Sequence, residues 1–350
     1  MRKKVTYLLG AGASANALPT YSSIFERIFI FDKVFSGLGG RQPKTFIDTY
    51  NFKLDFKYYG TPDNYARFLS RSESTEKDYA DFKSYITLFL MFEQFPFKIV
   101  GYKITENTLE SYYNEMVNYM HYGKLSNLGV SIKDYDTYNK TLHSAYDFRY
   151  LSFLNTIFEE KVEFNLPKNI NIISWNYDHQ IEFSISKLNM SAEIKNISGL
   201  TKLNGSASFN VGKINFKEFE KMEKIENIFT EIFNPHNYNE NNINENYISD
   251  ISFAWEDKDS SKITNSQNFL QESDAIVIIG YSFPNFNREI DRIIFENVDI
   301  SKTKIYVQDI NADQVIKKLS GVKTGMDKVA IPYTEINEFL IPNEFWEEKD

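Results

Sequence analysis

Four short apolar segments dominate the hydrophobic pattern of this chain, and turn residues flank each of them. They are Val5–Leu9, Ile170–Ser174, Asp274–Gly280 and Lys304–Val307. Segments this uniformly hydrophobic are typical of strands that are buried on both faces of a parallel sheet, and each is followed by residues with helical spacing. The pattern therefore predicts an α/β fold with a doubly wound, mostly parallel, Rossmann-like sheet.

The pattern changes between about residues 37 and 167, where aromatic and charged residues recur at helical spacing. Residues 78–86 show this spacing. The apolar stretch 85–97 is interpreted as a buried helix, because it is shorter than the roughly 20 residues that are needed to span a bilayer. Short strands are expected near residues 51–59. The sequence thus predicts a large, mainly helical insertion within the sheet topology.

These patterns divide the chain into three parts. Residues 1–36 and 168–325 are expected to form the Rossmann-like domain, residues 37–167 the aromatic-rich insertion, and residues 326–350 a C-terminal tail. The Asn-rich tract 236–242 is expected to be an exposed loop. With 350 residues, of which 42% are hydrophobic, the chain has enough material for one α/β domain with a large insertion or for two domains.

Charge and cysteine content narrow the possible functions. The net charge of −9 and the absence of a large basic run argue against direct binding of nucleic acid through bulk charge. The chain has no cysteine, which excludes disulfides, thiol nucleophiles and cysteine-ligated zinc. The first strand begins within a few residues of Met1 and leaves no room for a signal peptide, so we expect a cytoplasmic protein without membrane association.

Polar turns follow three of the predicted strands. They are Gly10–Ala15, Trp175–Asp178 and Gly280–Pro284. The carboxyl edge of an open α/β sheet is where such folds bind ligands, and a glycine turn lets backbone N–H groups approach a pyrophosphate. Simpler interpretations exist for each turn. The glycines can serve close packing of a helix on a strand, Asp178 can be a helix N-cap, and Asn176 can be a turn residue.

Taken in order, these motifs resemble those of the sirtuin-like family. The motifs that carry the resemblance are Gly10–Ser14 with Leu18–Pro19, Ser174–Asp178 with Glu182, Lys202–Ser206, and Gly280–Pro284. Within that family they look like the bacterial branch whose members consume NAD as effectors of antiphage defence. The resemblance extends from Val5 to about Asn311 and leaves out the helical insertion and the C-terminal tail.

The resemblance implies a set of site residues. Asn176 would line the nicotinamide–ribose pocket and be essential, with Asp178 beside it. Asn311 resembles the Asn that meets the adenosine ribose, although Asp309 lies close by and is able to do the same. The residues that the resemblance assigns to binding of NAD are Gly10, Ala11, Gly12, Ser14, Pro19, Gly280, Ser282 and Asn311.

One departure from the family concerns the residue after the Lys-Leu pair, where the family usually has His-Gly and this chain has Asn204-Gly205. A histidine can accept a proton from a ribose hydroxyl, whereas an amide can only form a hydrogen bond with it. Nicotinamide leaves as a neutral group through an oxocarbenium-like state, so positioning and charge stabilisation can suffice without a strong base.

Two histidines are candidate substitutes for the missing one. His179 directly follows the Asn-Tyr-Asp motif, but we expect it at a solvated surface position. His143 lies in the insertion, and its alternative is a packed position within a helix. The candidate catalytic residues are Asn176, Asp178, Asn204 and His143.

The resemblance implies an NAD glycohydrolase, which converts its substrate NAD to nicotinamide and ADP-ribose. No metal is expected, because the four-cysteine zinc module of the deacylase branch is absent. One alternative is a catalytically weakened sensor or regulatory subunit that binds NAD or ADP-ribose. Another is an NAD-dependent dehydrogenase, in which Arg27–Phe31 forms a second strand that ends at Asp32. Pro19 in the crossover helix and the unexplained Asn-Tyr-Asp motif count against the dehydrogenase.

The resemblance also implies partners. An effector that depleted NAD constantly would kill its host, so members of the family are held inactive until they are triggered. We therefore expect a homo-oligomer, or a complex with a defence partner such as an ATPase or an Argonaute-like protein. The aromatic insertion is a candidate assembly surface, since Tyr and Phe are favoured at interface cores, and a private hydrophobic core is the alternative.

Overall fold

The structure of the chain is a computed structural model, which describes residues 2–19, 24, 27–28, 61–72, 76–94, 98–99, 142–143, 146–158, 166–188, 197–209, 248–256 and 260–348. The chain forms two compact units. Unit 1 consists of Met1–Asn16, Tyr146–Ala207 and Ile251–Asp350, and unit 2 consists of Ala17–Ala145 and Ser208–Asp250. The sheet and most of the candidate site residues belong to unit 1.

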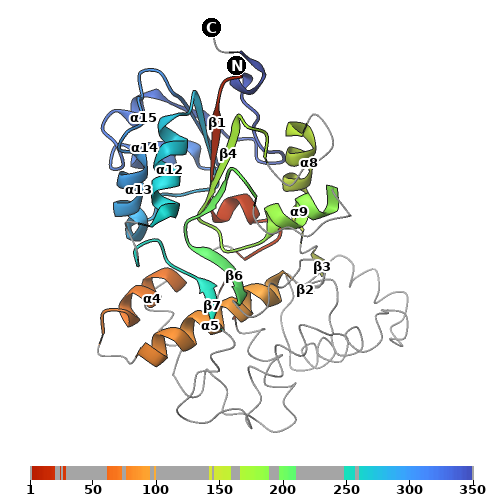
Figure 1. The fold of residues 1–350 in the computed structure, drawn as a ribbon, viewed down its shortest axis with the longest axis vertical. Coiled ribbons are helices and arrows are strands. Elements are labelled where there is room, and N and C mark those ends of the chain that lie inside the picture. The colour runs from red at the N-terminus through yellow and green to blue at the C-terminus, as the bar shows by residue number, and fades with distance from the viewer. Residues whose placement is uncertain are drawn as a thin grey trace, which may run out of the picture. The chain divides into compact units, whose positions relative to one another are not determined.

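Unit 1 contains a six-stranded sheet in the order β10-β9-β8-β1-β4-β5, in which every neighbouring pair is parallel (Figure 1). Numbered along the chain, the strands lie in the order 3-2-1-4-5-6 that dinucleotide-binding folds use. The predicted doubly wound, Rossmann-like sheet is confirmed. The strands are β1 (Val5–Leu9), β4 (Ile170–Ser174), β5 (Leu200–Lys202), β8 (Ala275–Ile279), β9 (Lys304–Gln308) and β10 (Ala330–Tyr333).

The register of the three central strands places their carboxyl ends level. Leu9 of β1 is paired with Ser174 of β4 on one side and with Ile279 of β8 on the other. The turns that follow these strands therefore begin at the same edge of the sheet. The order of the strands reverses between β1 and β8, which is the switch point where open α/β sheets bind ligands.

Both faces of the sheet are covered by helices, which explains why the central strands β1 and β8 are buried at every position. Ile276 and Ile278 of β8 belong to the core on one face, while Ala275, Val277 and Ile279 belong to the core on the other. Helices α12 (Ser261–Gln271), α13 (Arg288–Phe295), α14 (Ala312–Leu319) and α15 (Met326–Val329) cover the first face, and α8 (Phe148–Ile157) and α9 (Gln180–Leu188) cover the second (Figure 1).

The C-terminal residues belong to the sheet and its core, which differs from the predicted tail at 326–350. Strand β10 pairs with β9 at the edge of the sheet, and the short 3-10 helix η4 (Asn343–Trp346) buries Phe345 completely. Phe339 packs into the same core. The sequence did not reveal β10, because an edge strand of four residues with three exposed positions and Pro332 lacks an apolar run.

Unit 1 also resumes earlier than the predicted boundary at residue 168. Helix α8 begins at Phe148, after its N-cap Asp147 accepts a hydrogen bond from the N–H of Arg149. Its buried side chains, among them Tyr150 and Phe153, pack on the sheet core that contains Tyr7. The helical spacing of these aromatic residues predicts that they belong to the insertion, but those of α8 pack into the core of unit 1.

Unit 2 contains helices α4 (Pro62–Leu69) and α5 (Glu76–Glu93) among its described residues, and strands β2 (Lys98–Ile99) and β3 (Leu142–His143) form an antiparallel pair. Strands β6 (Gly205–Phe209) and β7 (Ser249–Ile251) pair where the chain passes between units. The predicted helix over residues 78–86 is confirmed, as is the buried helix over the first part of 85–97. None of the described helices is long and apolar enough to cross a membrane.

The second strand that the dehydrogenase alternative requires at Arg27–Phe31 is contradicted at its first two residues. Arg27 and Ile28 are helical, so the second strand required for a dehydrogenase-like site does not begin there. Their side chains are buried, and Arg27 forms an ion pair with Glu93 at 2.8 Å, which a position on the inner face of a helix explains. Asp32, the expected strands at 51–59 and the Asn-rich tract 236–242 lie outside the described residues.

Candidate functional site

The turns after β1 and β8 are packed backbone to backbone at the switch point. The N–H of Gly12 donates to the carbonyl oxygen of Gly280 at 2.9 Å, and the N–H of Gly10 donates to that of Ile279 at 3.0 Å. A Cβ atom at Gly280 would lie 2.4 Å from the backbone nitrogen of Ala13, and one at Gly10 would lie 2.6 Å from the oxygen of Gly280. Glycine is therefore required at positions 10 and 280, because the backbones of these two turns approach each other too closely to leave room for a Cβ atom.

Asn176, the first residue of interest after β4, contacts this turn directly. Its Nδ2 donates to the carbonyl oxygen of Gly10 at 2.9 Å and to Oγ of Ser14 at 3.1 Å. A carbonyl oxygen only accepts, so the amide group has one possible orientation, with its oxygen Oδ1 facing away from the turn. No described residue donates a hydrogen bond to Oδ1. The structure thus presents a hydrogen-bond acceptor in a fixed direction at the switch point.

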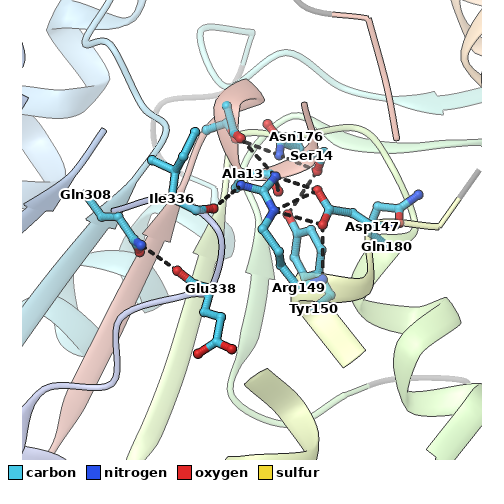
Figure 2. A network of polar contacts seen from close by, with 12 residues as sticks. Ala13, Ser14, Asp147, Arg149, Tyr150, Asn176, Gln180, Gln308, Ile336 and Glu338 are labelled. Atoms are coloured by element: carbon cyan, nitrogen blue, oxygen red, sulfur yellow. Dashed lines mark hydrogen bonds and ion pairs between the residues drawn. The ribbon is translucent and has the colours of Figure 1, made fainter. Parts of the chain in front are cut away.

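Ser14 connects Asn176 to Tyr150 (Figure 2). The hydroxyl oxygens of Ser14 and Tyr150 are 2.9 Å apart, and both side chains are buried. Burial raises the pKa of Tyr150 well above its ordinary value, and the nearby Asp178 adds to the effect. Tyr150 therefore keeps its proton, and one hydrogen bond joins its hydroxyl to that of Ser14 within the buried cluster.

Asp178 is the buried carboxyl group of this cluster. Burial raises its pKa, and the opposing effects of Lys202 and of the hydrogen bonds from Gln180 and Ser14 offset only part of that rise. Its Oδ1 accepts from the N–H of Gln180 at 3.0 Å, at the start of α9. Asp178 therefore bonds the first N–H of α9 from one residue before the N-cap position, which His179 occupies, and the same carboxyl group also faces Ser14.

A buried ion pair lies beside Asp178. Lys202 is 2.6 Å from Oε1 of Glu182, and its Nζ also donates to the backbone oxygen of Asp178. Burial by itself raises the pKa of Glu182, but Lys202 and His179 outweigh it and lower the pKa to about 2. Glu182, which is part of the motif after Asn176, thus remains charged and holds Lys202 in place.

His179 is buried, so the expected solvated position is wrong. Only 2% of its surface is exposed, and its Nε2 is 3.1 Å from the carbonyl oxygen of Ala207. Its Nδ1 faces Glu182 at 3.7 Å, and its ring packs edge-on against Phe183. The inward position of the ring is supported by the hydrogen bond of Nε2, by the nearby Glu182 carboxylate and by packing on Phe183.

Asn204 ties three segments of unit 1 together. Its Nδ2 donates to the carbonyl oxygen of Trp175 at 3.1 Å and to the hydroxyl of Tyr177 at 3.3 Å. Its Oδ1 accepts from the N–H of Ala254 at 3.1 Å, and the residue is 3% exposed. Both ends of this amide are thus occupied by groups of the protein, in contrast to Asn176.

Ser282 and Asn311 lie in the turns after two neighbouring strands, β8 and β9. Both residues are exposed. The N–H of Asn311 donates to Oδ1 of Asp309 at 2.7 Å, and its side chain makes no capping hydrogen bond to α14. The turn after β8 is strained, because Phe283 has a φ of 49° in a region that aromatic residues rarely adopt. Tyr281 of this turn stacks on Trp175 with ring centroids 5.6 Å apart.

The structure brings together most of the predicted site residues at one edge of the sheet. These are Gly10, Ala11, Gly12, Ser14, Asn176, Asp178, Asn204, Gly280, Ser282 and Asn311. His143 and Pro19 belong to unit 2 and are not joined to this group by the structure. His143 lies in strand β3, opposite Lys98, and not in a helix. No group of acidic or histidine side chains among the described residues is arranged to hold a metal ion.

Sequence analysis missed Arg149 and Asp147. The guanidinium of Arg149 donates to the carbonyl oxygen of Ala13 at 3.0 Å, and its Nε lies 2.9 Å from Oδ1 of Asp147 (Figure 2). Both side chains are buried. An N-cap pattern in sequence points to Asp147 as a helix start, but no spacing links Arg149 to a turn more than a hundred residues away.

The fold defines a doubly wound, Rossmann-like α/β protein, and the site lies at its switch point. No protein-family model matches the chain. No curated protein sequence matches it. Among solved structures, Sir2Tm bound to a propionylated peptide is similar, with 12% sequence identity, a TM-score of 0.36, and coverage of 95% of this chain and 86% of that one. A similarity this low carries no argument about function.

Proposed function

We propose that the protein is an NAD glycohydrolase, which cleaves NAD into nicotinamide and ADP-ribose at the switch point of unit 1. The observation that carries the proposal is the fixed amide of Asn176, whose Nδ2 is held by Gly10 and Ser14 and whose Oδ1 accepts no hydrogen bond from a described residue. The ordered motifs that resemble the sirtuin-like family, and in particular its NAD-consuming antiphage branch, support the same substrate.

The geometry suits a reaction that needs stabilisation of positive charge more than it needs a base. Cleavage of the bond between nicotinamide and the ribose passes through an oxocarbenium-like state, and the bonding electrons leave with neutral nicotinamide. The partial negative charge of Asn176 Oδ1 would face the ribose, with the Asp178 carboxyl group behind Ser14. Water then adds to the ribose carbon, and its proton passes to solvent.

A second candidate function is a sensor that binds NAD or ADP-ribose without hydrolysing it. Asn204 favours this alternative, because it stands where the family usually has a histidine and its amide is fully occupied by Trp175, Tyr177 and Ala254. No proton acceptor is offered from that position. The two candidates share the binding site and differ only in turnover.

In the cell we propose the role of a cytoplasmic effector in antiphage defence, held inactive until it is triggered. The partner would be a second copy of the chain or a defence protein such as an ATPase or an Argonaute-like protein. The motif resemblance to the NAD-consuming antiphage branch supports this role.

The test measures nicotinamide release from NAD by the purified protein and by its Asn176→Ala variant. We expect release by the natural protein and a loss of at least about a hundredfold in the variant, since one fixed polar group at a developing charge contributes roughly that much. Asn169→Ala is the matched control, because Asn169 precedes the same strand at its opposite end and donates only to Lys3 at 3.4 Å.

Calorimetry with NAD and ADP-ribose separates the candidates. Binding without turnover, alone or with a co-purified partner, would establish the sensor instead of the hydrolase. Absence of both turnover and binding would contradict both candidates.

A further inference from the structure

Two side chains from different parts of unit 1 hold the carbonyl oxygens of the glycine turn. Asn176 donates to the oxygen of Gly10 from one side. Arg149 donates to the oxygen of Ala13 at 3.0 Å and approaches that of Gly12 at 3.4 Å (Figure 2). The first of these contacts is part of the proposed site, whereas the second has no role in it so far.

Arg149 is itself held rigidly. Its Nε lies 2.9 Å and 3.1 Å from the two carboxylate oxygens of Asp147, whose side chain is fully buried. The backbone N–H of Asp147 donates to Oε1 of Gln180 at 2.8 Å, and the ring of Phe339 lies 5.2 Å from the guanidinium carbon. Removing two charges from water costs free energy that a buried pair only partly recovers, so such a pair is better suited to fixing geometry than to adding stability.

The same guanidinium reaches the segment 335–340, which we call the C-terminal strap. Nη1 of Arg149 donates to the carbonyl oxygen of Ile336 at 3.0 Å. Gln308, at the end of β9, fixes the strap on both sides of that point. Its Nε2 donates to the oxygens of Glu335 and Glu338 at 2.6 Å each, and its Oε1 accepts from the N–H of Leu340 at 2.9 Å.

We propose that Arg149 is a positioning residue for the pyrophosphate of NAD, an inference that rests on the proposed function. A carbonyl oxygen carries partial negative charge and repels a phosphate. By accepting hydrogen bonds from Arg149, the oxygens of Gly12 and Ala13 are kept turned toward the guanidinium. The planar guanidinium with its five N–H groups bonds the turn, Asp147 and the strap at once, which an ammonium group cannot do. The strap thereby becomes a support of the ligand site.

The test uses a double variant and a single variant. The double variant is needed because removing Arg149 alone would leave Asp147 as an unpaired buried charge. In the double variant Asp147→Asn with Arg149→Gln, both charges are removed, Asn keeps the helix cap, and the shorter Gln cannot bond Ala13 and Ile336 together. Arg149→Lys keeps the positive charge but lacks the planar set of N–H groups that bonds several partners at once. Arg292→Gln is the matched control, since Arg292 donates to the carbonyl oxygen of Gly321 at 2.9 Å, on an exposed part of the surface.

We expect the double variant to raise the KM for NAD about tenfold with kcat within about twofold, because a contact that positions a non-reacting part of the substrate supports ground state and transition state alike. Arg149→Lys should fall between the double variant and the natural protein, and Arg292→Gln should match the natural protein. All rates are measured well below the unfolding temperature of each variant. A fall in kcat at unchanged KM would overturn the inference.

Hydrogen exchange gives a reading that does not depend on turnover. The amides of Gly12 and Ala13 are protected by hydrogen bonds to the oxygens of Gly280 and Gly10. In the double variant we expect both to exchange at least about tenfold faster, since a lost net hydrogen bond changes an opening equilibrium by about that factor. Faster exchange of the strap alone would show that Arg149 only anchors the C-terminus. If the natural protein neither binds nor cleaves NAD, the proposed function fails, and exchange still decides whether Arg149 fixes the turn.

Discussion

Two asparagine side chains, Asn176 and Asn204, differ in how many of their amide atoms are hydrogen-bonded within the protein. Asn204 uses Oδ1 and Nδ2 for bonds within the protein, so it acts as a tie between segments. Asn176 uses only Nδ2, which donates to Gly10 and Ser14. Its oxygen accepts no hydrogen bond from a described residue, which is the basis of the proposed contact with a ligand. Burial does not separate these two cases, since both residues are less than a tenth exposed.

Asp291 is a buried carboxyl group whose charge state should make stability depend on pH. It is fully buried in α13 and accepts a hydrogen bond from the hydroxyl of Tyr281 at 2.9 Å. Burial raises its pKa to about 8, and the hydrogen bond from Tyr281 and the charge of Arg288 offset only part of that rise. The folded protein thus keeps the Asp291 proton over a range in which the unfolded chain has already lost it.

Because the folded state binds this proton more tightly than the unfolded chain does, the free energy of unfolding should fall as the pH rises from about 4 to about 8. The slope from Asp291 should reach up to about 1.4 kcal/mol per pH unit, and it should vanish above that range because both states are then ionised. The variant Asp291→Asn removes the slope. We expect urea unfolding at pH 5 to 8 to show Asp291→Asn gaining stability relative to the natural protein as the pH rises.

The control for this experiment is Asp299→Asn. Asp299 is exposed, and the hydrogen bond from Ser301 lowers its pKa, so its titration lies below the tested range. Glu182, with a pKa of about 2, also titrates below it. Parallel stability curves for Asp291→Asn and the natural protein would show that Asp291 is ionised in the folded state.

Among the elements, the contact between the turns after β1 and β8 is the tightest part of the site. Gly280 combines a φ of +58° with backbone atoms of Gly12 and Ala13 that lie 2.4 Å from the position of a Cβ atom. For Gly280→Ala we expect the free energy of unfolding to fall by about 3 kcal/mol or more, because overpacking and a left-handed backbone conformation both oppose the change. Thermal unfolding measures this loss.

Gly325→Ala provides the comparison at another left-handed position. Gly325 has a φ of +83°, but the nearest atom to its added Cβ would be the flexible Cδ1 of Ile300 at 3.2 Å. This variant should lose only about 1–2 kcal/mol, the cost of the backbone conformation itself. Equal losses at the two positions would mean that the turns separate easily and that their packing does not define the site.

At the scale of the whole molecule, unit 1 assembles its site from chain segments that are far apart in sequence. Residues 1–16 supply the glycine turn, residues 146–207 supply Arg149 and Asn176, and residues 251–350 supply the turns after β8 and β9 and the strap. Unit 2 accounts for the segments that are inserted between these parts. We propose the aromatic insertion predicted at residues 37–167 as the surface for assembly with a second copy or a partner.

We predict that the protein self-associates or co-purifies with a partner, because an effector that is held inactive until it is triggered needs such an assembly. Light scattering over a hundredfold range of concentration should give a molar mass above the 41.0 kDa of one chain. A matched measurement with Arg292→Gln, which alters only an exposed contact, should give the same mass. A monomer at every concentration, with no partner retained in purification, would contradict the prediction.

The sequence by itself determined the strands of the central sheet, since β1 and β4 have the predicted bounds and β8 and β9 differ by one or two residues. Burial on both faces demands an unbroken apolar run, and such a run is visible without a structure. The turns at the ends of those strands followed from the same pattern, whereas the order of the strands in the sheet came from the structure. The short edge strand β10 and the buried place of His179 did not, because neither leaves a periodic signal.

Only the tertiary structure decided which polar groups face one another. Sequence motifs named Asn176 and Gly10, but the bond between them, and with it the direction of the Asn176 oxygen, exists only once β1 and β4 lie side by side. The contact of Arg149 with the glycine turn and the strap likewise joins segments with no common pattern. The physical reason is that apolar burial is a property of one element, whereas a hydrogen bond needs two partners, and their meeting depends on the folded chain.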